Sequence, residues 1–376
     1  MGECSMPYLL SNEDVAQALD METSVRALES AVREWAHGNA AAVPRHNFFA
    51  PAGREGEVFQ FGVMSGGSKN DQLYCLRILD DVLYYQREGD LLTREKYCIE
   101  PGTYCGLLLL FSTANGELLG IMPDGIIQHM RVAGETAVGV DILANSDAST
   151  IGMLGSGGMA RSFAEAISVV RDIRGIKVYS PTREHREEYA RDMAERLDIE
   201  VQSVNGPREA IQGTDIVCLC TDSLRPVMSA EWMEPGQLVI SVGGGGGLLD
   251  VSGDMSLFQG FFAISTDDLA SAEDRGGGYM IGYSYFAGQP QDFGAIPQEA
   301  WWPAPEEHNR GVTRLLDVMS GAATGRSSRE DILHLWGGGY TTVGFSALAG
   351  IVYRAAKEKG LGQQIPLDWF VQKVRD

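Results

Sequence analysis

The stretch Ile151-Gly152-Met153-Leu154-Gly155-Ser156-Gly157-Gly158-Met159-Ala160 has the pattern of a strand, a glycine turn and the start of a helix. Helical spacing continues through Phe163, Ile167 and Val170. The turn fits G-x-G-x-x-A, in which the first glycine permits a tight bend and the second lets the backbone approach a pyrophosphate. We therefore predict that a dinucleotide binds here, at Gly155, Ser156, Gly157, Gly158 and Met159.

Strands and helices continue to alternate beyond this turn. Apolar runs predict strands at Gly175–Tyr179, Ile216–Cys220 and Leu238–Val242, and helical spacing predicts a helix at Glu184–Leu197. Alternation of this kind builds a parallel sheet covered by helices on both faces. The expected fold class is therefore α/β, with a Rossmann-type doubly wound parallel sheet.

The end of the second predicted strand bears on the choice of cofactor. An acidic residue there would bind the ribose hydroxyls of NAD, but this chain has Ser180, Thr182 and Arg183. Two hydroxyls and a guanidinium suit a 2′-phosphate, so we expect NADP, with NAD as the alternative. A purely structural interpretation stays open, in which Ser180 caps a helix that begins at Pro181 and Arg183 is solvated.

The rest of the chain has a different pattern of predicted helices and strands on each side of this region. Helical spacing fills the first 40 residues, short strands are predicted between Val58 and Pro123, and another helix follows at Ile127–Ala144. A last clear helix is expected at Val343–Lys359. We expect one domain from residues 1–146 and 326–376, and a nucleotide-binding domain from residues 147–325.

Charge and composition exclude several classes of partner. The chain has 376 residues and a net charge of −21, which disfavours nucleic acid and anionic membranes. No apolar run is long enough to span a bilayer, and the N-terminus lacks the pattern of a secretory signal. The six cysteines are dispersed, so we expect free thiols, a cytoplasmic protein and no metal site.

Several motifs together resemble the ornithine cyclodeaminase/mu-crystallin family. They are the glycine turn, Pro44-Arg45, the stretch 131–137 (RVAGETA) and Gly325-Arg326-Ser327, and they occur in consistent order over nearly the whole chain. The resemblance implies a dinucleotide-binding domain inserted into an α+β substrate domain that also forms a homodimer. Family members include cyclodeaminases, ketimine and imine reductases, alanine-type dehydrogenases, and lens or hormone-binding proteins.

The resemblance also implies roles for individual residues. Arg45 and Arg131 match arginines that hold a substrate carboxylate, and guanidinium groups suit this task because they bind a carboxylate through two parallel hydrogen bonds. From the residues alone, a surface salt bridge explains Arg45 equally well. The remaining matches lie at the predicted cofactor site, and they are Thr136, Thr221, Ser223, Val242 and Gly243. For Thr136, capping or core packing explains the residue equally well. Cys220, which precedes Thr221, is also expected at the cofactor site.

Two departures from the family pattern affect the expected chemistry. The family's catalytic lysine has no counterpart in the strand Leu76–Asp81, where Arg77 is the nearest cation, and Lys69 lies in a predicted turn. The aspartate that the family uses for cyclodeamination is replaced by five glycines at 243–247, with no acid before Asp250. The first departure leaves an arginine, which is a poor proton donor. The second disfavours ornithine cyclodeamination.

We therefore expect an NAD(P)H-dependent oxidoreductase that reduces an α-imino acid to an amino acid, or the reverse. Arg45, Arg77 and Arg131 would bind one or two carboxylates of this small substrate. The candidate proton donors, in order of preference, are His46, His129, Asp81 and Tyr85. Asp81 shares a strand face with Arg77, and we prefer to interpret it as the ion-pair partner of that arginine.

Two alternatives remain open from the sequence. The first is an ammonia lyase of the cyclodeaminase type, in which bound NAD is oxidised and reduced within one cycle. The second is a non-catalytic protein that binds NADPH and a small ligand.

Overall fold

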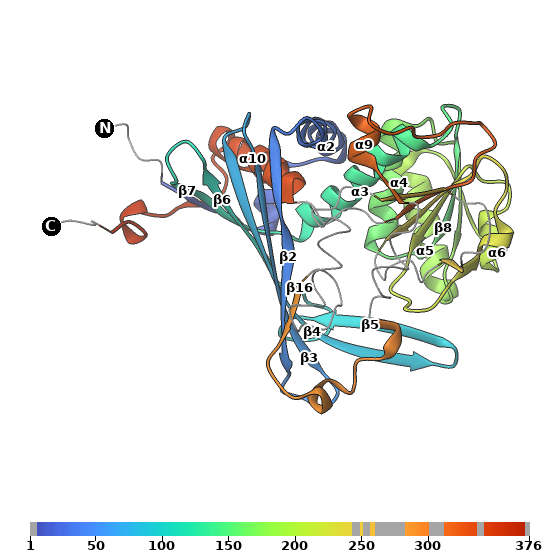
Figure 1. Cartoon of the computed structure of the whole chain (residues 1–376), viewed down its shortest axis with the longest axis horizontal. Coiled ribbons are helices and arrows are strands. Elements are labelled where there is room, and N and C mark those ends of the chain that lie inside the picture. Colours follow the sequence, from blue (N-terminus) through green and yellow to red (C-terminus); the bar gives the residue numbers. More distant parts are fainter. Residues whose placement is uncertain are drawn as a thin grey trace.

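The computed structural model describes residues 6–242, 249–250, 256–259, 283–300, 312–336 and 342–372. It consists of two lobes, each built on one large sheet, with helix α3 (Gly125–Leu143) lying between them (Figure 1). Among the described residues, no helix is both long and apolar enough to cross a membrane.

The first lobe is built on a long, mostly antiparallel sheet. Its strands lie in the order β16-β2-β3-β4-β6-β7-β1-β19, and β5 pairs with the far end of β4. The strands were expected to be short, but β2, β3 and β4 have 12, 11 and 16 residues. The bounds are β1 (Tyr8–Leu9), β2 (Ala40–Pro51), β3 (Val58–Ser68), β4 (Leu73–Glu88), β5 (Leu91–Tyr97), β6 (Gly106–Ser112), β7 (Leu118–Pro123), β16 (Tyr283–Phe286) and β19 (Gln363–Gln364).

Helices cover one face of this sheet and enclose a hydrophobic core. Helix α1 (Asn12–Ala18) begins at a capping box formed by Ser11 and Asp14, and α2 (Met21–Ala36) follows it. Helix α10 (Thr342–Lys359) contacts β3 and β4 on one side and α2 on the other. The fully buried Leu28, Leu110 and Phe345 belong to the core between these elements.

The second lobe is an eight-stranded sheet in the order β10-β9-β8-β11-β13-β18-β15-β17, and every pair in it is parallel. This confirms the doubly wound α/β class that the alternating pattern predicts. The strands are β8 (Thr150–Leu154), β9 (Gly175–Tyr179), β10 (Glu200–Ser203), β11 (Ile216–Cys220), β13 (Leu238–Val242), β15 (Ser256–Gln259), β17 (Val312–Arg314) and β18 (Leu333–Trp336). The helices are α4 (Gly158–Val170), α5 (Arg183–Leu197), α6 (Pro207–Ile211) and α9 (Leu315–Met319), and a separate short pair joins β12 (Met228–Ser229) to β14 (Leu249–Asp250).

Two strands lie in a different sheet from the one that the predicted domain limits would give them. Strand β18 follows residue 326 but pairs with β13 and β15 in the parallel sheet. Strand β16 precedes residue 325 but lies beside β2 in the first lobe. The limits at 147 and 325 therefore stay a prediction, and the chain crosses between the lobes more often than a single insertion requires.

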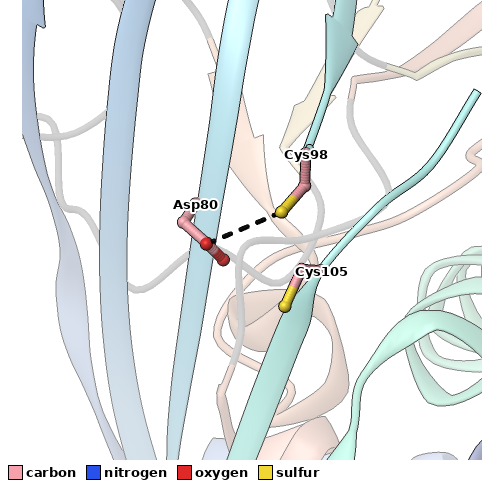
Figure 2. A group of neighbouring side chains, drawn as sticks. All are labelled: Asp80, Cys98 and Cys105. Carbon is pink, nitrogen blue, oxygen red and sulfur yellow. Dashed lines mark hydrogen bonds between the residues drawn. The ribbon is translucent and has the colours of Figure 1, made fainter. Parts of the chain in front are cut away.

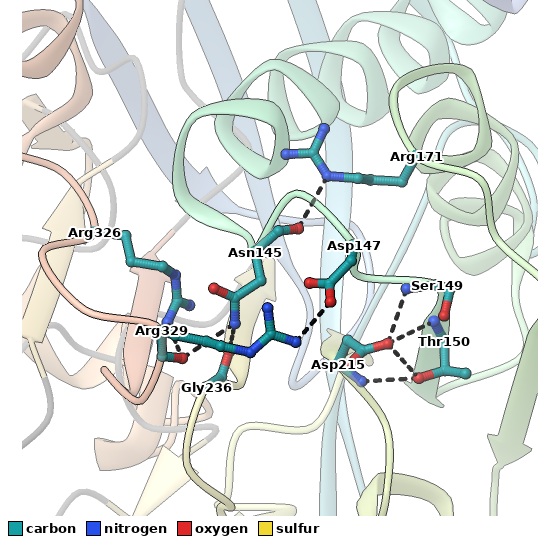
Figure 3. Close-up of polar contacts among 9 residues, drawn as sticks. All are labelled: Asn145, Asp147, Ser149, Thr150, Arg171, Asp215, Gly236, Arg326 and Arg329. Carbon is teal, nitrogen blue, oxygen red and sulfur yellow. Dashed lines mark hydrogen bonds and ion pairs between the residues drawn. The ribbon is translucent and has the colours of Figure 1, made fainter.

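A polar network joins the end of α3, the helix between the lobes, to the segments that lead into the parallel sheet (Figure 3). The Arg326 guanidinium donates to the carbonyl of Leu143, which is the last residue of α3, and to that of Asp331. Asn145 donates to the carbonyls of Gly236 and Arg329. Because the last carbonyls of a helix lack partners within the helix, Arg326 satisfies a group that would otherwise need water.

A second connection is made by the hairpin of β4 and β5, which reaches across to the parallel sheet (Figure 1). The outer edge of β5 pairs with the segment that follows β11: Arg94 N–H donates to the Asp222 carbonyl at 3.3 Å, and Leu224 N–H donates to the Leu92 carbonyl at 2.8 Å. The hairpin of the first lobe therefore lies against the carboxyl ends of the parallel strands.

Asp215 belongs to the polar network shown in Figure 3, and its hydrogen bonds lead to a stability prediction. One carboxylate oxygen of this residue accepts from the Ser149 and Thr150 amides and from the Thr150 hydroxyl, at 2.7–3.0 Å. We expect Asp215→Ala to lower the free energy of unfolding by about 2 kcal/mol, because hydrogen bonds to a charged group are lost.

Urea unfolding followed by circular dichroism measures this change. Asp172→Ala is the matched control, since Asp172 is 80% exposed and pairs with Arg174 at the surface. Its effect should stay within about 0.5 kcal/mol. Equal effects of the two substitutions would contradict the role given to Asp215.

Candidate functional site

The glycine turn has a geometry that only glycine can adopt. Gly155 has a φ of +117°, and a Cβ placed there would lie 1.9 Å from the carbonyl oxygen of Cys220, at the end of β11. At Gly157 a Cβ would meet nothing within 4 Å, so the surface beside the turn is open. Helix α4 begins there without a side-chain cap, which leaves its first amides available to an anion. Met159 is half-buried and packs against the core of this lobe.

The residues at the end of β9 divide into a buried one and two exposed ones. Ser156 donates to the buried Ser180 hydroxyl at 2.9 Å. The helix cap is Thr182, so the interpretation of Ser180 as a cap is wrong. Thr182 and Arg183 are exposed, and Arg183 forms an ion pair with Glu187 at 2.6 Å. No acidic side chain stands at residues 180–183.

The opposite side of the turn contains the residues that follow β11. The Thr221 hydroxyl accepts from the Ser223 amide, and the buried Ser223 hydroxyl donates to the Arg225 carbonyl. Ser223 also forms a bridge with Thr93 of β5, so it takes part in the hairpin contact. Burial raises the pKa of the Cys220 thiol. Val242 ends β13 half-buried, and Gly243 lies outside the described residues.

Helix α3 places Thr136 inside the protein. Its side chain is buried, and its hydroxyl donates to the Val132 carbonyl one turn earlier in the helix. This hydrogen bond accounts for the hydroxyl within the helix, and the expected contact between Thr136 and the cofactor has no support in this geometry.

Arg77 and Arg131 are both buried and both paired with acids. Arg77 lies 2.6 Å from Asp124, and Arg131 lies 3.0 Å from Glu135. Both guanidinium carbons lie within 5.0 Å of the ring centroid of the buried Phe345. The expected ion pair between Arg77 and Asp81 is therefore wrong, because α3 brings Asp124 closer to Arg77 than the sequence reveals.

Arg45 is buried on the face of the sheet that carries Arg77. Its Nε donates to the Asn47 side-chain oxygen at 2.8 Å, and the Gln60 amide donates to the same oxygen at 3.0 Å. A Cβ at Gly62 would lie 3.1 Å from the Arg45 Nη2, so the glycine makes room for the guanidinium. The sequence left a surface salt bridge open for Arg45, and its burial excludes that interpretation.

Lys96 is a central residue of the site that the sequence did not indicate. It lies on β5, 3.4 Å from Asp81, and its side chain remains 40% exposed. Burial of its surroundings lowers the pKa of Lys96, Asp81 raises it, and the nearby Arg77 and Arg45 lower it further. The ammonium also lies 5.1 Å from the ring centroid of Tyr104. Lys96 is thus a reachable amine in a cationic environment.

A local signal for this placement exists in the sequence. Gly89-Asp90 separates the strand Leu73–Glu88 from the strand Leu91–Tyr97, and Gly89 adopts a φ of +58°. A glycine–aspartate pair between two strand-like runs indicates a hairpin. Folding the chain back at this turn sets Lys96 opposite Leu83 and on the same face as Asp81.

The other candidate proton donors are placed very differently from one another. His129 of α3 faces the glycine turn, where its Cε1 would lie 2.8 Å from a Cβ at Gly158. Burial and Lys96 lower the pKa of His129, and Asp124 raises it. His46 lies between Arg45 and Asn47 and points to the opposite face of the sheet, where its ring stacks on Tyr285 at 6.1 Å.

Tyr85 is also unsuited to proton donation. Its hydroxyl is buried and has no hydrogen-bond partner among the described residues. Burial raises the pKa of Tyr85 to about 12. The groups that the fold brings together are therefore Arg45, Asp81, Lys96 and His129, beside the glycine turn.

At 24% identity, the chain is similar to an NAD(P)H-dependent anabolic L-arginine dehydrogenase of Pseudomonas aeruginosa, over 63% of this chain and 68% of that protein. It is also 24% identical to a Delta(1)-pyrroline-2-carboxylate reductase of Bacillus cereus, over 70% of this chain and 74% of that protein. Across the curated relatives, alignments cover from 42% to 74% of their lengths, so the chain spans less than half of some of them.

The fold is shared with an archaeal alanine dehydrogenase dimer with bound NAD. That structure matches with a TM-score of 0.69 at 21% identity, over 96% of this chain and 99% of the other. The model of the ornithine cyclodeaminase/mu-crystallin family matches residues 6–360. The chain therefore belongs to the ornithine cyclodeaminase/mu-crystallin family.

Proposed function

We propose that this protein is an NAD(P)H-dependent oxidoreductase that reduces the C=N bond of an α-imino acid to an amine, or catalyses the reverse oxidation. The observation that carries the proposal is the position of Lys96. The ammonium of Lys96 is accessible, and its partner is the buried carboxylate of Asp81. Lys96 also lies near Arg45 and near His129, which faces the glycine turn.

The glycine turn fits a dinucleotide. A bound pyrophosphate would use the uncapped amides at the start of α4, next to the open space at Gly157. The exposed Thr182 and Arg183 and the absence of an acid at residues 180–183 favour the 2′-phosphate of NADP, although NAD remains the alternative. When bound, the reduced nicotinamide supplies the hydride.

The protein's own residues would bind the substrate and handle the proton. Arg45 and the cationic field around it attract the substrate carboxylate. Arg77 and Arg131 were expected to bind carboxylates themselves. Each is held by its own acid beside Phe345, and the two lie behind this site in fixed positions. Lys96 gives a proton at Nζ to the imine nitrogen during reduction, and takes one back from the amine during oxidation.

The relatives support this reaction class because both the pyrroline-2-carboxylate reductase and the arginine dehydrogenase act, by name, on amino or imino acids. Ammonia release without net turnover of the cofactor would instead identify a lyase. Cofactor binding without turnover of any imino acid would identify a binding protein.

We also propose that the protein is a cytoplasmic homodimer. The archaeal alanine dehydrogenase is a dimer, and the first lobe exposes large apolar side chains at Val43, Phe48, Leu107 and Tyr285. All described cysteines are free, as a reducing compartment requires. Light scattering coupled to size-exclusion chromatography should give twice the mass of one chain, and a monomer's mass would contradict the dimer.

The NADP preference can be tested at Arg183. We expect Arg183→Asp to weaken NADPH binding by about 10- to 100-fold relative to NADH, because a carboxylate would repel the 2′-phosphate. Nicotinamide fluorescence titrations with both cofactors measure this ratio.

Arg174→Asp is the control, because it makes the same charge change at an arginine that is equally exposed, at the opposite end of β9. It should leave the ratio unchanged. A wild-type preference for NADH would contradict the NADP assignment without affecting the proposed reaction.

The role of Lys96 can be tested by two substitutions. We expect Lys96→Met to reduce kcat for imino-acid reduction by about 100- to 10,000-fold, the usual contribution of a positioned proton donor. The Kd of the cofactor should change little, since Lys96 lies on the substrate side. Lys96→Arg should keep KM near the wild-type value without restoring kcat, because arginine holds the charge but does not release its proton.

Lys69→Met is the matched control, since Lys69 is exposed in the turn after β3, and it should behave as wild type. Full activity in Lys96→Arg would show that Lys96 acts only as a charge. Full activity in Lys96→Met would remove it from the mechanism.

A further inference from the structure

Three potential metal ligands meet on the side of β4 away from the proposed site. Asp80, Cys98 and Cys105 come from β4, from the end of β5 and from the start of β6 (Figure 2). Their ligand atoms all lie within 4.8 Å of one another, and the Cys98 thiol donates to the Asp80 carboxylate at 3.8 Å. Asp80 and Asp81 point to opposite faces of the strand, so this cluster is separate from Lys96 and Asp81.

The spacing is close to what a tetrahedral ion needs. Zinc binds sulfur at about 2.3 Å and carboxylate oxygen at about 2.0–2.2 Å, which sets neighbouring ligands roughly 3.5–3.8 Å apart. Shifts of about 1 Å or less in the side chains would therefore bring all three atoms onto one ion. Asp80 and Cys98 are half-buried and Cys105 is exposed, so an ion can reach the cluster and a water can complete its coordination.

The charge distribution also favours a cation. Of the aspartates near the site, Asp81 pairs with Lys96 and Asp124 pairs with Arg77. Asp80 forms no ion pair with a cation among the described residues, and it accepts a hydrogen bond from the Cys98 thiol. A divalent cation bound here would supply the positive charge that pairs with the Asp80 carboxylate.

The turn that carries the two thiols is already ordered by backbone contacts. Cys98 N–H donates to the Thr103 carbonyl at 2.9 Å, and the Thr103 hydroxyl bonds to the carbonyls of Cys98 and Glu100. Ile99 has a φ of +70°, an uncommon conformation for a branched residue. These contacts keep both thiols near Asp80, so the protein loses little conformational entropy when an ion binds.

We propose that Asp80, Cys98 and Cys105 form a binding site for a thiophilic divalent cation such as Zn²⁺. The ion clamps the connection between β5 and β6. Lys96 precedes Cys98 by two residues, and Tyr104, whose ring faces the Lys96 ammonium, precedes Cys105 by one. The proposed metal site therefore has a structural role. It lies outside the reaction site and fixes the strand that carries Lys96. The sequence does not indicate this site, because its cysteines are dispersed along the chain. Only the pairing of β4 with both β5 and β6 brings the thiols together.

Cobalt can be used as the spectroscopic probe, since Co²⁺ bound to thiolates gives an intense near-ultraviolet charge-transfer band. We expect the reduced, metal-free full-length protein to bind one Co²⁺ per chain with this band, and Zn²⁺ to displace it. Cys98→Ser and Cys105→Ser should each lower the intensity by about half, because each removes one of two thiolates. Asp80→Asn should keep the band but weaken affinity at least about 10-fold, as loss of even an outer partner does.

Cys75→Ala is the matched control, because Cys75 is a buried thiol elsewhere on β4 and its loss should leave the band unchanged. Absence of a thiolate band in the wild-type protein overturns the proposal. So does a band that survives in the Cys98→Ser/Cys105→Ser double variant, or reduced protein that binds no metal while air oxidation joins Cys98 to Cys105. None of these readouts uses catalysis, so failure of the metal site and failure of the proposed reaction remain distinguishable.

Discussion

The pairing of β5 with residues 222–224 is the contact on which the proposed site depends. Two backbone hydrogen bonds, which together form the bridge between Thr93 and Ser223, attach a hairpin of the first lobe to the carboxyl edge of the parallel sheet. That edge is where open α/β sheets bind their ligands, because the loops after neighbouring strands separate there. Lys96 lies on the attached hairpin, so the lysine stands at this edge although its strand is far from the glycine turn in sequence.

Buried charge in the first lobe is organised as separate pairs. Arg77 with Asp124, Arg131 with Glu135 and Lys96 with Asp81 each neutralise one cation with one acid. Loss of one member of a buried pair costs more than the pair itself contributes, because the other charge is left without compensation. Arg77 and Arg131 are therefore held in position by their acids, whereas the partly exposed Lys96 can still reach a small molecule.

The sequence predicted the features that depend on local pattern. The limits of β9, β11, β13 and α10 agree with prediction within one residue, and the glycine turn has the conformation that its motif requires. Features that depend on contacts between distant segments were not predictable in this way. The partner of Arg77 is the N-cap residue of α3, β16 joins a sheet far from its neighbours in sequence, and a hairpin brings Lys96 to the site. Periodicity indicates which face of a strand is buried, but it does not indicate which distant strand covers that face.

The two connections between the lobes have a mechanical consequence. The network of Asn145, Gly236 and Arg326 lies at the amino edge of the parallel sheet, and the β5 contact with residues 222–224 lies at its carboxyl edge. Between these two edges, α2 packs against α3, α4 and α9, and Val25 and Val32 of α2 belong to the same apolar core as Met153 and Leu335 of the parallel sheet. Rotation of one lobe against the other would expose part of this core to water. The shared core therefore opposes such rotation, and the strand that carries Lys96 stays beside the carboxyl edge of the parallel sheet.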